Sequence, residues 1–171
     1  MVVSGLFSWV LPYMLPKEYA AIQYIFSACL FAPLLYTLSE VSSIGIAISK
    51  KTRYSMYSSV IAVIINAIGN YLLVPILGAI GAAISTALSF FVFFLLRTEF
   101  SKKVWRKYNT SKAYILVFMV LLASISDALV FQGSASSLLL WGGLLISGLF
   151  FFKGTINLLL KWIKFKLYSN I

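Results

Sequence analysis

The chain of 171 residues contains no histidine, a single cysteine and only four acidic residues. Without histidine it lacks the commonest general base and metal ligand of proteins. Cys29 alone can form neither a disulfide nor a thiolate metal site within one chain. The sequence also has no nucleophile elbow, phosphate-binding glycine loop or spaced metal-ligand motif. We therefore expect a protein that is not an enzyme and that uses no cofactor or metal ion.

Charge is scarce along the whole chain, with 11% charged and 61% apolar residues, whereas a soluble domain has roughly 25% charged residues. A transmembrane helix needs about 20 mostly apolar residues. The apolar runs predict an all-α integral membrane protein with six or so transmembrane helices over residues 1–153. The predicted helices cover residues 2–15, 19–49, 54–77, 78–96, 113–131 and 134–152. The first run is short, and we interpret it as a helix that has lost its beginning.

The net charge of +10 is concentrated in alternate connections between these runs. Residues 50–53, 97–112 and 153–166 carry 13 of the 14 Lys and Arg residues. The positive-inside rule then predicts a multi-pass protein with a basic cytoplasmic loop at 97–112, a basic amphipathic cytoplasmic tail at 154–171 and a cytoplasmic carboxyl terminus. The loop could bind anionic lipid head groups, although a topology signal is the simpler interpretation. Charges spread between spans do not form the folded basic patch that nucleic-acid binding needs.

Two acids lie within predicted helices, and intramembrane acids are candidate functional groups because they are costly to bury. Glu40 and Asp127 are therefore candidates for lining a cavity or coupling an ion. Simple hydration at a membrane interface is the alternative for both, and it is the favoured one for Asp127. Asn66 and Asn70 stand four residues apart and share one helix face. They could line a polar cavity, but we favour hydrogen bonding to a neighbouring helix.

The two asparagines belong to a stretch, NAIGNYLLVPILGAIGAAIST, in which two apolar runs meet at a short turn. The pattern N-x3-N-x-hydrophobic-hydrophobic-x-P, followed by G-x2-G-A-A, resembles that of polysaccharide exporters and O-antigen flippases of the multidrug/oligosaccharidyl-lipid/polysaccharide superfamily. The resemblance extends over residues 15–96. The matching residues are Asn66, Asn70, Leu72, Leu73, Pro75, Gly78, Gly81, Ala82, Ala83, Ser85 and Thr86. It implies a structural role for the proline, the two glycines and the two alanines.

This resemblance implies the carboxyl-terminal lobe of a transporter that works with a second, amino-terminal lobe around a central cavity. The implied function is translocation of undecaprenyl-diphosphate-linked oligosaccharide across the bacterial inner membrane during biosynthesis of surface polysaccharide such as the O-antigen of lipopolysaccharide. None of the basic residues lies well inside a predicted span, so we expect the other lobe to supply the cations that bind the diphosphate. The alternatives are a drug or cation antiporter of the same superfamily, a membrane enzyme of polysaccharide assembly, and an inactive remnant.

Overall fold

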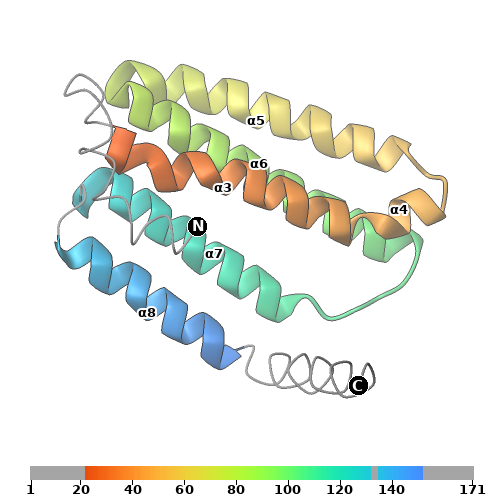
Figure 1. Cartoon of the computed structure of the whole chain (residues 1–171). Helices are drawn as coiled ribbons and strands as arrows, with labels where there is room; N and C mark the ends of the chain where they lie inside the picture. Colours follow the sequence, from red (N-terminus) through yellow and green to blue (C-terminus); the bar gives the residue numbers. More distant parts are fainter. Residues whose placement is uncertain (1–21, 132–134, 152–171) are drawn as a thin grey trace, which may run out of the picture.

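The computed structural model describes residues 22–131 and 135–151, and within them it contains helices and no strands (Figure 1). The helices are α3 (Ile22–Ser42), α4 (Ile44–Ile48), α5 (Arg53–Leu77), α6 (Ala79–Val104), α7 (Ser111–Ser126), the π-helix η3 (Asp127–Phe131) and α8 (Ala135–Phe151).

Three stretches of these helices, Arg53–Leu77, Ala79–Val104 and Ser111–Leu129, are long and apolar enough to cross a membrane. The prediction of an all-helical chain is thus confirmed for the described residues, and the three apolar helices are consistent with a membrane protein. The count of six spans stays a prediction. The run at 2–15 and the tail at 154–171 lie outside the described residues.

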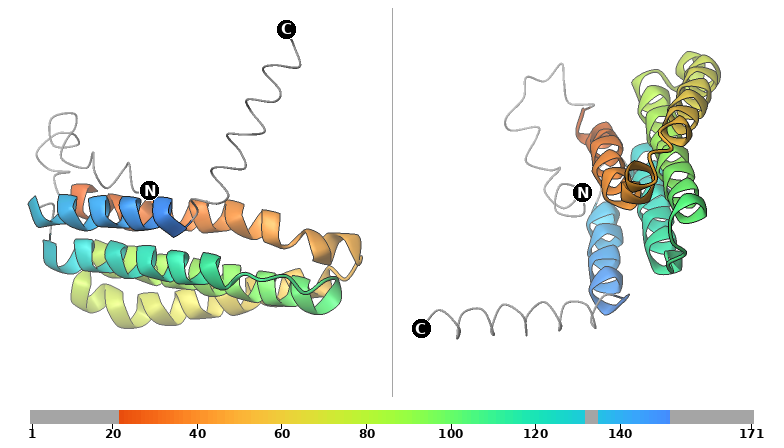
Figure 2. Two further views of the ribbon diagram at one scale, coloured as in Figure 1. Left: turned by 90° about the horizontal axis from the view of Figure 1, so that it is seen from below. Right: turned by 90° about the vertical axis from the view of Figure 1, so that its right-hand side faces the viewer.

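Helix α6 is the central element, because both α5 and α3 pack along it (Figures 1 and 2). Helix α7 lies beside α3 and α6, and α8 packs against α7 on the side of the bundle away from α5 (Figure 2). The buried apolar core is formed by α3, α6, α7 and α8. Its members are Phe31, Leu35, Ala87, Phe94, Val117, Val120, Leu121 and Trp141.

Helix α5 contributes no large side chain to this core, and its one buried residue is Ser58. Instead it exposes apolar side chains along its length, among them Val63 and Tyr71, which are 66% and 81% exposed. Such a surface is tolerated in a bilayer because lipid tails are as apolar as the side chains themselves.

The structure divides the helix predicted over 19–49, because α3 ends at Ser42 and α4 begins at Ile44. Proline does not cause the break, since Pro33 lies within α3. Two serine hydroxyls at the break bond to the backbone instead. Ser42 donates to the carbonyl of Ser39, and Ser43 donates to the carbonyl of Glu40. Side chains that bond to the backbone in this way compete with the helical pattern and often bend helices.

Helix α6 is longer than predicted, since it continues to Val104 rather than ending before residue 97. Glu99 and Lys102 form an ion pair of 2.7 Å one turn apart on its surface, which supports a helix. Lys102 and Lys103 also lie in its last turn, where the helix dipole favours cations. The predicted basic loop of 97–112 is therefore reduced to residues 105–110, and Arg97 belongs to a helix.

Candidate functional site

The α5–α6 hairpin carries the pattern of asparagines, proline and glycines described above. Its two helices pack so closely that their backbones approach each other. Gly78 forms the turn with a φ of +56°, a conformation that favours glycine. A Cβ at Gly81 would collide with the backbone carbonyl of Leu73, and one at Gly69 would collide with the side chain of Ser85. Glycine at these positions is thus needed for the close approach of the two helices.

The remaining structural residues of the pattern lie on the same hairpin. Pro75 is inside α5, two residues before its end. Ala83 is buried, with 6% of its surface exposed, and Ala82 is half-buried. Small side chains at these positions are typical of tightly packed membrane helices.

Asn66 is the centre of a polar cluster between α5 and α6. Its Nδ2 donates to Thr86 Oγ1 at 3.3 Å and to Ser89 Oγ at 3.2 Å. Asn70 Nδ2 donates to Asn66 Oδ1 at 2.9 Å, and Ser85 Oγ donates to the Asn66 carbonyl at 3.0 Å. Asn66 therefore joins the helices, while Asn70 supports Asn66.

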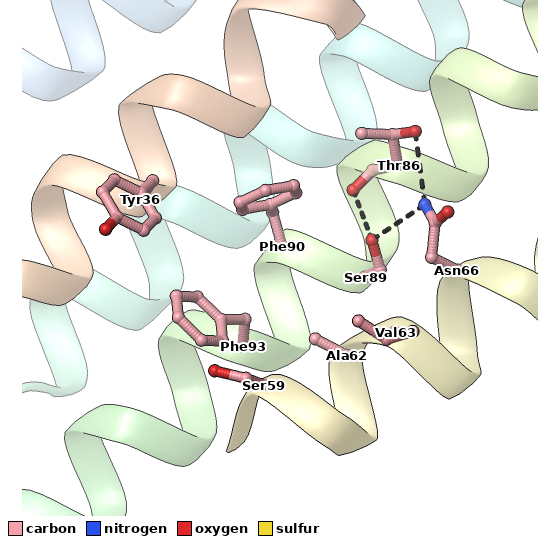
Figure 3. A pocket seen from close by; sticks show the side chains of 9 residues that line it. All are labelled: Tyr36, Ser59, Ala62, Val63, Asn66, Thr86, Ser89, Phe90 and Phe93. Carbon is pink, nitrogen blue, oxygen red and sulfur yellow. Dashed lines mark hydrogen bonds between the residues drawn. The ribbon is translucent and has the colours of Figure 1, made fainter. Parts of the chain in front are cut away.

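The same cluster forms one wall of a cavity of about 400 Å³ that lies on α6 between α3 and α5 (Figure 3). The cavity exists because α3 and α5 both pack on α6 but are not packed against each other. Aromatic rings line one part of it and hydroxyl and amide groups another. The lining residues are Tyr36, Ser59, Ala62, Val63, Asn66, Thr86, Ser89, Phe90 and Phe93. Asn66 thus fills both roles considered for it, helix packing and cavity lining.

A buried arginine lies next to this cavity. Arg97 is 8% exposed, and its NH1 group donates to Glu40 Oε1 at 2.6 Å and to Ser39 Oγ at 3.2 Å. The guanidinium carbon lies 5.1 Å from the ring centroid of Phe93, and Phe93 in turn stacks on Tyr36 with centroids 6.2 Å apart. These two aromatic residues line the cavity and connect it to the ion pair.

The ion pair is asymmetric in exposure, because the Glu40 side chain is 50% exposed and that of Arg97 only 10%. Among the described residues Arg97 Nε has no hydrogen-bond partner, so part of its donor capacity is unused. Glu40 is thus half-exposed and is the counterion of a buried cation.

Arg97 lies within α6 and not in the loop that was predicted to begin at residue 97. It stands seven residues before the end of α6 at Val104, which is roughly 10 Å along the helix axis. A signal for this was present in the sequence, since the spacing of Glu99 and Lys102 favours continuation of the helix beyond Arg97.

The second acidic candidate is separate from the cavity and is not hydrated in the way we expected. Asp127 is 2% exposed and begins η3, a π-helical turn of a kind often found at functional sites. Its Oδ2 accepts a hydrogen bond of 3.1 Å from the indole nitrogen of Trp141, which is fully buried. The indole N–H is thus a hydrogen-bond partner of this buried carboxylate.

Asn66 and Glu40 thus lie at neighbouring parts of one site, the cavity and the ion pair beside it. Asp127 lies elsewhere, in η3 next to Trp141. Within residues 22–131 and 135–151, no group of three or more His, Cys, Asp or Glu side chains could hold a metal ion. Comparison of the chain with family models, curated proteins and solved structures found no match.

Proposed function

We propose that this chain is the carboxyl-terminal lobe of a flippase that moves undecaprenyl-diphosphate-linked oligosaccharide across the bacterial inner membrane. The observation that carries the proposal is the cavity between α3 and α5 together with the arginine beside it. A lipid-linked oligosaccharide needs hydroxyl-binding groups, apolar surface and a cation. The first two kinds of group line the cavity, and the cation lies beside its Phe93.

The polar wall of the cavity suits sugar hydroxyls, because Asn66, Thr86 and Ser89 offer both donors and acceptors. The rings of Tyr36 and Phe93 offer apolar faces on the opposite side. Arg97 adds a permanent positive charge in a setting of low dielectric, where an arginine suits phosphate oxygens. In this proposal Glu40 keeps the guanidinium paired while no substrate is present.

The cavity is open to one side of the bundle, and we propose that a second lobe closes it. Support comes from α5, which forms a wall of the cavity and yet has an exposed apolar face that includes Val63. A chain that supplies half of a cavity would not transport alone. Vectorial transport by this chain by itself in reconstituted vesicles would overturn this part of the proposal.

The function is tested in a bacterium that carries the gene, by deletion and complementation. Deletion should remove surface polysaccharide and cause undecaprenyl-diphosphate-linked oligosaccharide to accumulate in the inner membrane. Wild type should restore export, Arg97→Gln should restore less than about one tenth of it, and the control Arg53→Gln, which removes an exposed cation at the start of α5, should restore it fully. A tenfold loss in the rate of export corresponds to about 1.4 kcal/mol in the activation free energy of transport. Normal polysaccharide after deletion, with no accumulated precursor, would refute the proposal.

A drug or cation antiporter of the same superfamily is the second candidate, and the burial of Asp127 favours it, because a deeply placed carboxylate suits a compact cation. The variant Asp127→Asn separates the two candidates. An antiporter should lose cation-coupled efflux, whereas a flippase should retain polysaccharide export because Asp127 lies outside the cavity.

A further inference from the structure

A second and larger cavity, of about 610 Å³, lies where α3, α4, α6 and the start of α7 meet. This volume is within the range of about 300–1,000 Å³ that is usual for ligand pockets. Its walls are mainly apolar, with Leu38, Val41 and Phe94 deeper along the helices and Trp105 and Tyr108 near the end of α6. From Phe94 to Trp105 the cavity follows α6 for roughly 16 Å, so it is long enough for a segment of extended hydrocarbon chain.

The cavity is accessible from outside the bundle rather than enclosed. Val41 is 72% exposed, and Trp105 is 51% exposed. Tryptophan and tyrosine are enriched at the level of lipid head groups, so the end marked by Trp105 and Tyr108 corresponds to the membrane interface. The apolar walls below them then face the hydrocarbon of the same leaflet.

Unpaired cations surround this end of the bundle. In the described part of the chain the two acids at this end, Glu40 and Glu99, are engaged by Arg97 and Lys102. The other seven cations there have no carboxylate partner: Lys50, Lys51, Arg53, Lys103, Arg106, Lys107 and Lys112. This end of the described chain therefore carries an excess of positive charge.

Two of these cations belong to a connection that is anchored beside the cavity. Arg106 and Lys107 are exposed and stand between Trp105 and Tyr108, both of which line the cavity. The Tyr108 hydroxyl donates to the carbonyl of Ser42 at 3.0 Å, which ties the connection to the end of α3.

From this juxtaposition we infer that the cavity at the basic end binds an anionic phospholipid of the bilayer. One acyl chain occupies the apolar groove along α6, and the phosphate lies at Arg106 and Lys107. Anionic head groups attract basic residues near a membrane surface, which raises the affinity by roughly fivefold for each residue. The inference does not depend on the proposed transport function, because it needs only that the helices lie in a bilayer.

The test uses the full chain in phosphatidylcholine nanodiscs with a small fraction of brominated lipid, since bromine quenches nearby tryptophan. The difference between wild type and Trp105→Phe isolates the signal of Trp105. Brominated phosphatidylglycerol should quench Trp105 half-maximally at a roughly thirtyfold lower mole fraction than brominated phosphatidylcholine, because two cations select the anionic head group. Equal quenching by the two lipids would overturn the inference.

Double variants that each remove two cations distinguish a specific lipid site from a diffuse basic surface. Arg106→Gln combined with Lys107→Gln should abolish the preference for phosphatidylglycerol. The control combines Lys50→Gln with Lys51→Gln, which removes two cations from the same end of the bundle but not from the connection between Trp105 and Tyr108, and it should keep the preference. If both double variants lower the preference equally, the end is only a diffuse basic surface and the inference fails.

A further pair of variants tests the place of the acyl chain. Ala113 lines this cavity and Ala62 lines the first one, and both are half-buried alanines. Ala113→Phe fills the groove and should remove most of the quenching of Trp105 by phosphatidylglycerol, whereas Ala62→Phe should leave it unchanged. Unaltered quenching in Ala113→Phe would show that no chain occupies the groove, and would overturn the inference.

Discussion

The ion pair between Glu40 and Arg97 leads to an unusual expectation, that removing the exposed partner destabilises the protein more than removing the buried one. Glu40→Gln leaves a guanidinium that is only 10% exposed without a counterion. Arg97→Met instead replaces the buried cation by an apolar chain of similar length and leaves a carboxylate that is 50% exposed and can be hydrated. Loss of one partner of a buried pair costs about 3–5 kcal/mol, whereas exposed pairs are worth about 0–1 kcal/mol.

Because one partner is buried and the other half-exposed, we expect an intermediate cost of about 2 kcal/mol for Glu40→Gln. Arg97→Met should cost under about 1 kcal/mol, since apolar replacement of buried ionic groups is often nearly neutral. The double variant should resemble Arg97→Met alone, because without the guanidinium the charge of Glu40 has no partner to lose. The measurement is the free energy of unfolding in mixed micelles of a mild detergent and dodecyl sulfate.

The control is Glu99→Gln, which changes the other ion pair in the same way. Lys102 also contacts the Tyr114 hydroxyl at 3.4 Å, and its flexible chain can extend to water, so the cost should stay below about 1 kcal/mol. The reasoning is refuted if Arg97→Met is the more destabilising single variant, or if the double variant equals the sum of the two single ones.

Three further outcomes are expected in the same unfolding assay. Gly81→Ala should destabilise the protein by about 2 kcal/mol or more, because the added methyl group meets the Leu73 carbonyl. The control Gly142→Ala has open space around the added methyl group and should change the stability by less than about 0.5 kcal/mol. Equal effects of the two variants would contradict the close packing of the hairpin. Asn66→Leu should cost about 1 kcal/mol, since interhelical hydrogen bonds in membranes average about 0.6 kcal/mol each and two are lost, and a neutral result would argue against their formation. Asp127→Leu should cost about 1–3 kcal/mol more than Asp127→Asn, which keeps an acceptor for the indole of Trp141; a smaller difference would count against this hydrogen bond.

The hairpin could be predicted closely from sequence, because its geometry depends on residues near one another in the chain. The predicted helix of 54–77 is found as α5, Arg53–Leu77. Gly78 and Gly81 act within a few residues of the turn, where a positive φ or a close carbonyl leaves no room for a side chain. The end of α6 was missed because the cluster of basic residues was interpreted as a loop, although Glu99 and Lys102 support a helix.

By itself the sequence determined the helical class, the apolar helices able to cross a membrane and the gathering of basic residues in alternate connections. These properties follow from local composition and do not depend on how the helices pack. The tight turn at Gly78 could likewise be predicted from the residues next to it.

Only the tertiary structure decided which polar groups meet. Glu40 and Arg97 are 57 residues apart in sequence. Asp127 of η3 accepts a hydrogen bond from Trp141 of α8. Helix α3 is apolar around most of its circumference, so no amphipathic pattern marks the face that will turn inward. The rotation of each helix is set by interhelical packing, and that rotation places Arg97 beside one cavity and leaves the other open at the surface of the bundle.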